Sequence, residues 1–388
     1  MLHLANKGKV EIKSKVKVEN ERDLSLAYTP GVAEPCKEIA ADKETVYKYT
    51  SKGNMVAVVS DGTAVLSLGD IGPEAALPVM EGKAVLFKEF AGVDAFPICV
   101  GTKNPDEIVK LVKYLEPSFG GINLEDIAAP RCFEIEGRLK EILDIPVFHD
   151  DQHGTAIVVL AGLTNALKLA GKDMGKVTVV INGSGSAGIA IARLLIDAGI
   201  GNIIMCDLKG IIHRDAGWLN PAQKVMSEIT NKNNVTGNLN NALASTDVFI
   251  GVSGPGALSQ EGLKAMGEKP IVFAMANPVP EIMPDEAKAA GAFVVATGRS
   301  DYPNQINNVL AFPGIFRGTL DVRARCISEG MKMAAAKAIA GLISDDELSQ
   351  EYIIPKPFDK RVSKAVAAEV ARTAISEGIA KNPEVPSY

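Results

Sequence analysis

The sequence of 388 residues lacks features that mark several classes of protein. It has no run of about 18 apolar residues, so we expect no segment that spans a membrane. Its first residues include no apolar stretch followed by a cleavage site, which argues against a secretory signal. No basic stripe accompanies the modest net charge of −6, so nucleic acid is not an expected partner.

Cysteine is also scarce, and no Cys-x-x-Cys pair occurs. An odd number of scattered cysteines indicates reduced thiols rather than a disulfide framework, and hence a cytoplasmic protein. The five are Cys36, Cys99, Cys132, Cys206 and Cys326. Short repeats and coiled-coil heptads are absent too, so a repeat architecture is not expected.

What the sequence does contain, from Met55 onward, is an alternation of short apolar runs and longer amphipathic stretches, which predicts an α/β fold. In the first half we expect strands at 55–60, 96–100, 121–124 and 145–148, and helices near 78–90, 105–116 and 130–143. Residues 64–68 are predicted to pair with 55–60 as a hairpin. The charged first 25 or so residues predict an arm or a short helix.

The second half is predicted to be a doubly wound parallel sheet of the Rossmann type, followed by a helical, alanine-rich tail from Arg323. Its strands are expected at 176–181, 202–206, 248–252, 271–274 and 293–296. A long apolar helix over 154–171 precedes them and is expected to bridge two domains. We therefore predict an N-terminal α/β domain over 1–153 and a dinucleotide-binding domain over 154–388.

A glycine-rich turn follows the first strand of the second half and opens a helix. This Gly-x-Gly-x-x-Gly pattern, Gly183 to Gly188, allows a tight turn, close approach of a pyrophosphate and close helix packing. Asp207 ends the next expected strand and is positioned to bind a ribose hydroxyl, which favours NAD. Lys209 could instead tolerate the 2′-phosphate of NADP. A structural glycine turn without a nucleotide is the less favoured alternative.

Carboxylates cluster after two other expected strands, in Glu125-Asp126 and in Asp150-Asp151. Strand ends in open α/β sheets share one edge, so Glu125, Asp126 and Asp151 can converge on a hard divalent cation. On spacing alone, helix caps and surface acids explain these residues about as well. His149 and His153 are four apart, but a strand-to-helix turn between them argues against a zinc pair.

Two further residues, Tyr28 and Lys83, do not indicate a function when each is considered alone. Tyr28 in Tyr-Thr-Pro-Gly-Val stands on a rigid turn and alone indicates packing. Lys83 in Glu-Gly-Lys-Ala alone indicates a solvated lysine, and Lys88 is an equal candidate by position.

Together these motifs resemble the malic enzyme family over nearly the whole chain. The resemblance is carried by eight motifs in order: Tyr-Thr-Pro-Gly-Val, Leu-Gly-Asp-Ile-Gly (68–72), Gly-Lys-Ala, Glu-Asp-Ile, Phe-His-Asp-Asp-Gln-His-Gly-Thr-Ala, Asn-Gly-Ser-Gly-Ser-Ala-Gly, Ala-Asn-Pro (276–278) and Asn-Asn-Val-Leu-Ala-Phe-Pro-Gly (307–314). The length is similar to that of the short bacterial form.

The resemblance implies a role for each matching residue. Tyr28 would be the general acid, Lys83 the general base, and Asp150 a carboxylate that supports the lysine. Glu125, Asp126 and Asp151 would bind Mg²⁺ or Mn²⁺, and Lys83, Asn277 and Asn308 would contact substrate. The dinucleotide residues would be Gly183, Ser184, Gly185, Ser186, Ala187 and Gly188, with Asp207 and Lys209. One departure is Ala64, which stands where larger members carry an arginine for the substrate carboxylate.

The implied activity is oxidative decarboxylation of L-malate to pyruvate with NAD or NADP, by a homodimer. The resemblance also implies decarboxylation of oxaloacetate as a side activity. Three alternatives remain: a malolactic enzyme that keeps its dinucleotide and releases lactate, an amino-acid dehydrogenase that needs no metal, and a non-catalytic nucleotide sensor. Release of free NADH argues against the malolactic enzyme, and loss of activity with EDTA argues against the amino-acid dehydrogenase. Any turnover argues against the nucleotide sensor.

Overall fold

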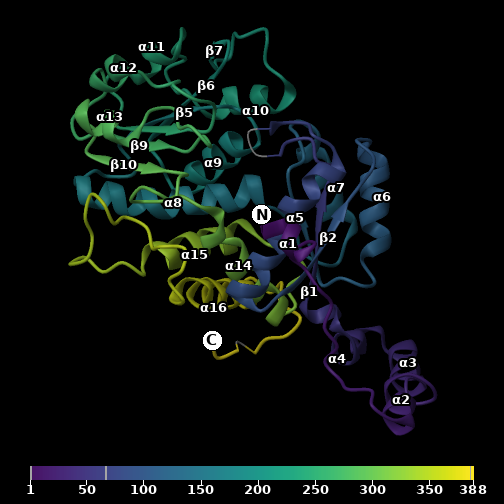
Figure 1. The fold of residues 1–388 in the computed structure, drawn as a ribbon. Coiled ribbons are helices and arrows are strands. Elements are labelled where there is room, and N and C mark those ends of the chain that lie inside the picture. The colour runs from purple at the N-terminus through teal and green to yellow at the C-terminus, as the bar shows by residue number, and fades with distance from the viewer. Residues whose placement is uncertain (1, 66–67, 385) are drawn as a thin grey trace.

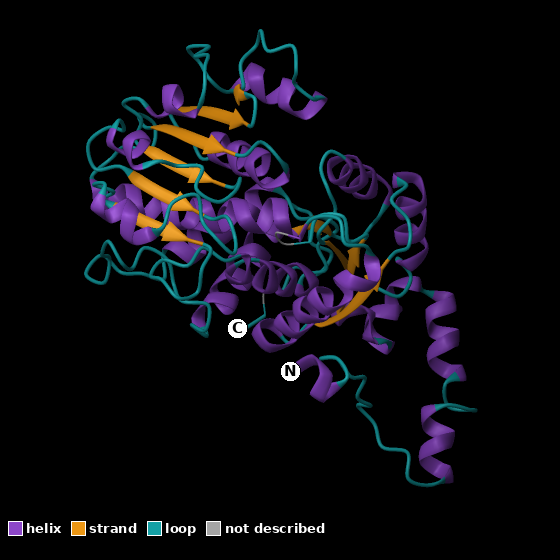
Figure 2. Cartoon of the chain, turned by 45° about the horizontal axis from the view of Figure 1, so that its top comes forward, coloured by secondary structure: helices purple, strands orange, loops and turns teal. Residues whose placement is uncertain are grey.

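The structure, a computed structural model, describes residues 2–65, 68–384 and 386–388 (Figure 1). Two separate sheets, each covered by helices, form two lobes of the molecule (Figures 1 and 2). The long helix α8 (Asp150–Ala170) begins at the end of the first sheet and leads into the second. The α/β class, with a Rossmann-type second half and a helical C-terminal end, is confirmed.

The first sheet has the strand order β2-β1-β3-β4, and all its strands are parallel. Its strands are β1 (Met55–Ser60), β2 (Asp94–Cys99), β3 (Gly121–Leu124) and β4 (Val147–His149). Its helices are α5 (Pro73–Ala91), α6 (Pro105–Leu115) and α7 (Arg131–Ile142). Alternate residues of β1 face opposite cores: Val56 and Val58 pack toward α5, and Ala57 and Val59 toward the α6–α7 side. This two-sided burial explains why the strand is apolar throughout.

The hairpin expected after β1 is wrong, because β1 pairs in parallel with β2 and β3 on its two sides. Gly62 has a φ of +69°, and the chain turns there toward the following helix. The Ala64 N–H then donates to the Asp126 carbonyl at 2.9 Å instead of pairing with β1. Leu66 and Ser67 lie outside the described residues, whereas Val65 forms only an isolated bridge with Gly69.

The second sheet has the order β10-β9-β8-β5-β6-β7. Its strands are β5 (Thr178–Asn182), β6 (Asn202–Asp207), β7 (Gly210–Ile211), β8 (Val248–Gly251), β9 (Ile271–Ala274) and β10 (Val294–Thr297). Its helices are α9 (Ser186–Asp197), α10 (Pro221–Ile229), α11 (Leu239–Leu243), α12 (Gln260–Lys264) and α13 (Pro284–Ala289). Only β7 is antiparallel; with two residues it is too short to leave a pattern in the sequence.

The helical tail expected from Arg323 contains α15 (Glu329–Ala340) and α16 (Arg361–Ser376). The short 3-10 helix η4 (Asn308–Leu310) and α14 (Phe312–Asp321) precede it. Helix α14 packs back onto the first lobe, because the ring of Phe87 in α5 lies 4.7 Å from that of Phe312 and 5.2 Å from that of Phe316. Helix α8 is long and apolar enough to cross a membrane by composition, but most of it is buried inside the fold.

The N-terminal residues form an arm that projects from the first lobe (Figures 1 and 2). The first helix, α1 (Leu2–Asn6), lies beside α5, where the Lys9 N–H donates to Glu81 Oε2 at 3.0 Å (Figure 1). The projecting arm follows and contains α2 (Glu21–Ala27), α3 (Ala33–Ala41), η1 (Lys43–Thr45) and α4 (Val46–Tyr49), and η2 (Ser51–Asn54) leads from it into β1. Neither α2 nor α3 has a buried residue. Several large apolar side chains of the arm are exposed instead: Ile12, Val16, Val18, Leu24, Leu26 and Tyr28. The arm therefore presents an apolar surface to its surroundings.

Candidate active site

The carboxyl ends of three neighbouring strands bring acidic residues to one edge of the first sheet. Asp61 follows β1, Glu125 and Asp126 follow β3, and Asp150 and Asp151 follow β4 at the start of α8. The order β1-β3-β4 makes these ends adjacent. This is the edge at which open α/β sheets bind ligands.

Three of these acids form a compact cluster. Ligand oxygens of Glu125, Asp126 and Asp151 lie within 4.8 Å of one another. Asp126 has a φ of +53°, a left-handed conformation that aims its side chain toward the others. Its backbone N–H donates to Asp151 Oδ2 at 2.8 Å, while its own Oδ2 is buried without a partner.

The pKa values of the three clustered acids are raised because negative charges are crowded in a buried space. Burial, together with the charges of Asp151 and Glu125, raises the pKa of Asp126 to about 9. Burial likewise raises the pKa of Glu125 and of Asp151 above their ordinary values. Three converging carboxylates with one orphaned oxygen are the donor set that a hard divalent cation requires. The residues present therefore fit Mg²⁺ or Mn²⁺.

Lys83, in α5, lies beside this cluster and is buried. Its ammonium is 2.6 Å from Asp150 Oδ2 and 2.9 Å from Glu125 Oε1. Burial alone lowers the pKa of this lysine, but the charges of Asp150 and Glu125 outweigh burial and raise the pKa above its ordinary value. Lys88, the other candidate, instead forms an exposed ion pair with Asp94. The geometry thus favours Lys83 as the lysine of the site.

His153 takes no part in the acidic cluster, although it lies on the same helix as Asp151. Its Nε2 is 2.7 Å from Glu136 Oε1, and its Nδ1 is 3.0 Å from Lys332 Nζ. Because a lysine ammonium can only donate, Nδ1 accepts and Nε2–H donates. Both ring nitrogens of His153 therefore have partners already, and the zinc pair with His149 gains no support.

The glycine-rich turn joins β5 to α9 as expected. Gly183 has a φ of +115°, and Ser186 begins α9, whose N–H groups point into the turn. A Cβ at Gly188 would lie 1.8 Å from the Gly183 carbonyl oxygen, so helix and strand touch here. A Cβ at Gly185 would meet nothing within 4 Å, so the middle of the turn is open. The turn fits a pyrophosphate.

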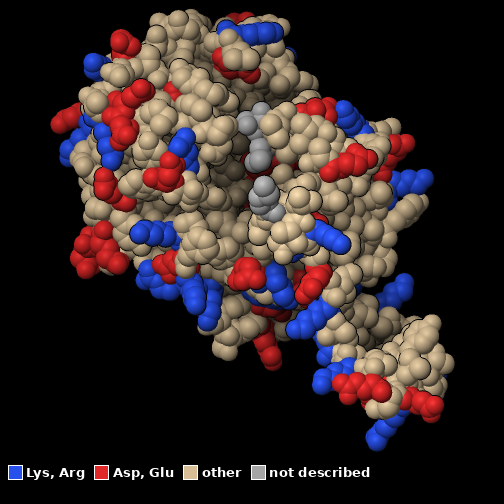
Figure 3. All heavy atoms as spheres, viewed as in Figure 1, with Lys and Arg blue, Asp and Glu red and all other residues tan. Residues whose placement is uncertain are grey.

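One cavity of about 730 Å³ joins these two regions. The first sheet and its loops contribute Ala64, Asp126 and Ile127, and the glycine-rich turn contributes Ser186 and Ala187. Asp151, Asn277 and Asn308 line it as well. Figure 3 shows the surface hollowed between the two lobes. The volume is within the range of small-molecule and cofactor sites.

Tyr28 lies away from this cavity within the chain. It directly follows α2, and the residue is 68% exposed. Figures 1 and 2 both show α2 in the projecting arm, whereas Lys83 lies in the middle of α5 in the first lobe. One chain therefore does not bring Tyr28 and Lys83 together.

Two groups of contacts were not foreseen from the sequence. The guanidinium of Arg131, at the start of α7, donates to Asp61 and to Thr63, the neighbour of Ala64. Ser184 in the glycine-rich turn donates to the Asp207 carboxylate, as does Gln223 in α10. Asp207 ends a strand and Gln223 follows an Asn-Pro helix start, but only the folded chain makes them neighbours.

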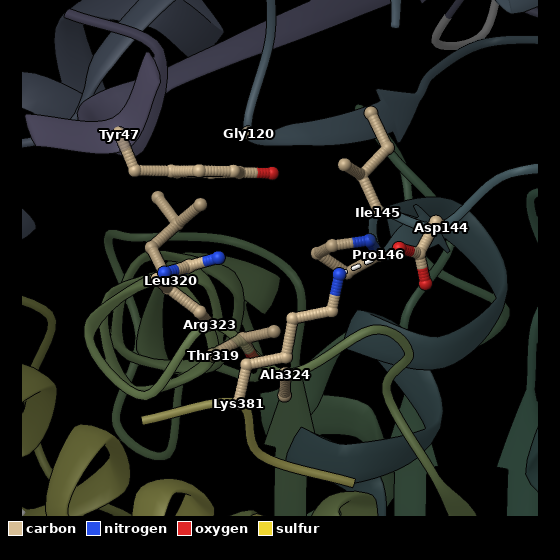
Figure 4. A pocket seen from close by; sticks show the side chains of 10 residues that line it. All are labelled: Tyr47, Gly120, Asp144, Ile145, Pro146, Thr319, Leu320, Arg323, Ala324 and Lys381. Atoms are coloured by element: carbon tan, nitrogen blue, oxygen red, sulfur yellow. Dashed lines mark hydrogen bonds and ion pairs between the residues drawn. The ribbon is translucent and has the colours of Figure 1, made fainter. Parts of the chain in front are cut away.

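A second, very small cavity of about 10 Å³ lies at the base of the arm (Figure 4). The Arg323 guanidinium packs 4.2 Å from the centre of the Tyr47 ring, and Lys381 pairs with Asp144. A space of this size holds a water molecule at most. These contacts fix α4 against the body rather than bind a substrate.

Models of two domain families match most of the chain. The description "Malic enzyme, N-terminal domain" applies to residues 6–140, and "Malic enzyme, NAD binding domain" to residues 152–375.

Individual proteins match over nearly the full length. The chain is 63% identical to the bifunctional malic/malolactic enzyme of Bacillus subtilis, over 98% of this chain and 93% of that protein. It is 58% identical to the NAD-dependent malic enzyme of Geobacillus stearothermophilus, over 100% of this chain and 80% of that protein. The crystal structure of malic enzyme from Pyrococcus horikoshii superposes with a TM-score of 0.93 at 54% identity, covering 97% of this chain and 88% of that one.

Proposed function

The chain belongs to the malic enzyme family, and from this premise we propose how its own residues carry out the reaction. The reaction is the oxidative decarboxylation of L-malate to pyruvate and CO₂, with reduction of NAD or NADP. The observation that carries the proposal is one cavity lined both by Asp126 and Asp151 of the acidic cluster and by Ser186 and Ala187 of the glycine-rich turn. Hydride transfer requires that malate and the nicotinamide meet in one such space.

Glu125, Asp126 and Asp151 are the residues that hold the divalent cation. When bound, the cation supplies positive charge that polarises the C2 oxygen of malate and stabilises the enolate left after loss of CO₂. The fit rests on the buried, unpartnered Oδ2 of Asp126 and on the raised pKa values of all three acids.

Lys83 is the general base that removes the proton of the C2 hydroxyl while hydride leaves C2 for NAD(P)⁺. A lysine accepts a proton only when neutral, whereas the surrounding carboxylates raise its pKa. Neutralisation of those carboxylates on cation binding opposes that effect. Asp150, 2.6 Å away and fully buried, positions the Lys83 amine.

Asn277 and Asn308 line the same cavity and supply polar contacts to the malate carboxylates. Ala64 also lines it, so this position offers no charge to the substrate.

Tyr28 protonates C3 of the enolate to give pyruvate, and we propose that it does so from the arm of a second copy of the chain. The support is its exposure in an arm with an apolar surface, away from Lys83 of the same chain. The active form is then a homodimer in which each cavity receives a tyrosine from the partner. Five free cysteines are in keeping with a cytoplasmic enzyme.

The similarity to a bifunctional malic/malolactic enzyme favours lactate as a second product to test for. The assay supplies L-malate and Mn²⁺ with NAD⁺ or NADP⁺, and follows reduced nucleotide, pyruvate and lactate. We expect pyruvate and reduced nucleotide in equal amounts, and loss of both on chelation of the metal. Lactate without free reduced nucleotide would establish the malolactic reaction instead, and turnover that survives chelation would contradict the metal role.

A further inference from the structure

The carboxylate of Asp207, at the end of β6, is held by three donors. Its Oδ2 accepts from the Ser184 hydroxyl at 2.5 Å and from Gln223 Nε2 at 2.6 Å. Its Oδ1 accepts from the Leu208 N–H at 2.6 Å. Gln223 also donates to the Ser184 hydroxyl at 2.8 Å, so the three side chains form a closed triangle.

The amide of Gln223 can face this triangle in only one orientation. Gln223 is the third residue of α10, and its Oε1 accepts from the backbone N–H of Asn220, the N-cap, at 3.0 Å. In return, the Asn220 side chain accepts from the Gln223 N–H at 2.9 Å. This capping box fixes the carbonyl side of the amide, so the NH₂ group must point at Ser184 and Asp207. Gln223 is 6% exposed and Ser184 is 5% exposed, so water offers little competition.

Lys209, the basic residue that could accept a 2′-phosphate, is not held in place as Asp207 is. The ammonium of Lys209 lies 5.8 Å from the centre of the Trp218 ring. Lys209 is exposed, so this contact is weak and leaves the ammonium free to move. The carboxylate, in contrast, cannot rotate away from an incoming phosphate without breaking buried hydrogen bonds.

We propose that Gln223 is a positioning residue that sets the dinucleotide preference by holding the Asp207 carboxylate at the ribose end of the site. A carboxylate fixed in this position accepts hydrogen bonds from a free 2′-hydroxyl and repels a 2′-phosphate. The hydroxyl of Ser184 acts through Asp207 and not on the pyrophosphate. This inference rests on the proposed function, since it requires that a dinucleotide occupies the glycine-rich turn.

The test is calorimetric binding of NAD⁺ and NADP⁺ to the intact protein in the absence of malate, for the wild type and for Gln223→Met. Methionine keeps the length and volume of the side chain but offers Asp207 no donor. We expect the wild type to bind NAD⁺ more tightly than NADP⁺, and Gln223→Met to reduce the ratio of the two dissociation constants by about tenfold. Turnover with saturating NAD⁺ should change far less than that ratio.

A matched control is Asn241→Ala. Asn241 occupies the same third position of α11 and forms the same capping box with Asn238, but the donors to the Asp207 carboxylate are Ser184, Leu208 and Gln223 instead. Asn241→Ala should lower the melting temperature about as much as Gln223→Met does, because each variant breaks one capping box. It should keep the wild-type ratio of the NADP⁺ and NAD⁺ dissociation constants. An unchanged ratio in Gln223→Met, or a wild type that binds NADP⁺ more tightly, would overturn the inference while leaving the malate reaction intact. A wild type that binds neither dinucleotide would contradict the proposed function itself.

Discussion

At the scale of single residues, the site is dominated by one buried ammonium among four carboxylates. Lys83 contacts Glu125 and Asp150 directly, and the charge of Asp151 also acts on it. One positive charge cannot balance four ionised carboxylates in a buried space, and this cost is what raises the pKa of Asp126 to about 9 when no cation is bound. A divalent cation bound by Glu125, Asp126 and Asp151 would neutralise this excess negative charge. Binding of the cation and the pKa of Lys83 are therefore coupled.

Substitutions of Lys83 and of Tyr28 distinguish the general base from the general acid. Lys83→Arg keeps the positive charge beside Asp150, but a guanidinium does not give up its proton, so malate oxidation should fall by about 10²–10⁴-fold. Tyr28→Phe keeps the ring and removes only the hydroxyl. It should most strongly slow tritium exchange at C3 of pyruvate, which is checked alongside hydride transfer from malate. An equal, modest loss at both steps in both variants would refute this division of roles.

Asp151→Ala tests the metal site, because Asp151 belongs to the acidic cluster but lies outside the glycine-rich turn. We expect binding of Mn²⁺, followed by calorimetry, to weaken strongly and malate turnover to be abolished, while the NAD⁺ dissociation constant changes little. Asp94→Ala is a suitable control, since Asp94 forms a surface ion pair with Lys88. Near-normal malate oxidation by Asp151→Ala would contradict the ligand assignment.

At the scale of secondary-structure elements, Gly185 and Gly188 of the glycine-rich turn have different roles. Gly188 lets α9 pack onto the end of β5, and a Cβ there would collide with the Gly183 carbonyl oxygen at 1.8 Å. Gly185 meets nothing, so its missing side chain leaves open the space into which a pyrophosphate fits. One glycine therefore supports the fold and the other supports binding.

The two alanine variants should separate these effects. Gly188→Ala is expected to destabilise the protein by about 1–3 kcal/mol through overpacking, which thermal unfolding measures. Gly185 has a φ of −83°, which alanine adopts freely, so Gly185→Ala should keep its melting temperature and lose affinity for NAD⁺. A Gly185→Ala protein that binds NAD⁺ as well as the wild type would show that the dinucleotide does not pass over this turn.

The elements that carry the site were largely predictable from the sequence. Apolar runs locate β1, β3, β4 and β5, and the carboxylates that follow them meet because parallel strands end at a common edge. The two-residue strand β7 and the return of α14 onto α5 leave no local pattern. Contacts such as Arg131 with Asp61, or Gln223 with Asp207, depend on packing between segments distant in the sequence.

At the scale of the whole molecule, the motif around Tyr28 identified a residue type but not its location in space. The short motif around Tyr28 specifies a local turn. The position of Tyr28 relative to a cavity depends instead on the conformation of the whole segment 10–50. That path leads outward from the first lobe (Figures 1 and 2), and its apolar side chains are exposed. Exposed apolar surface of this kind marks contact between protein chains. We therefore propose that a complete site takes Lys83 from one copy and Tyr28 from another.

Hybrid dimers test this claim most directly. Tyr28→Phe and Lys83→Arg chains, each inactive in pyruvate formation, are co-expressed with different affinity tags, and native mass spectrometry verifies the hybrids. If the tyrosine acts across the dimer, each hybrid contains one intact site, so a random mixture should recover about a quarter of the wild-type activity. Purified hybrids should recover about half. Hybrids no more active than the two parent variants would contradict the two-copy site and place Tyr28 and Lys83 of the same chain in one cavity.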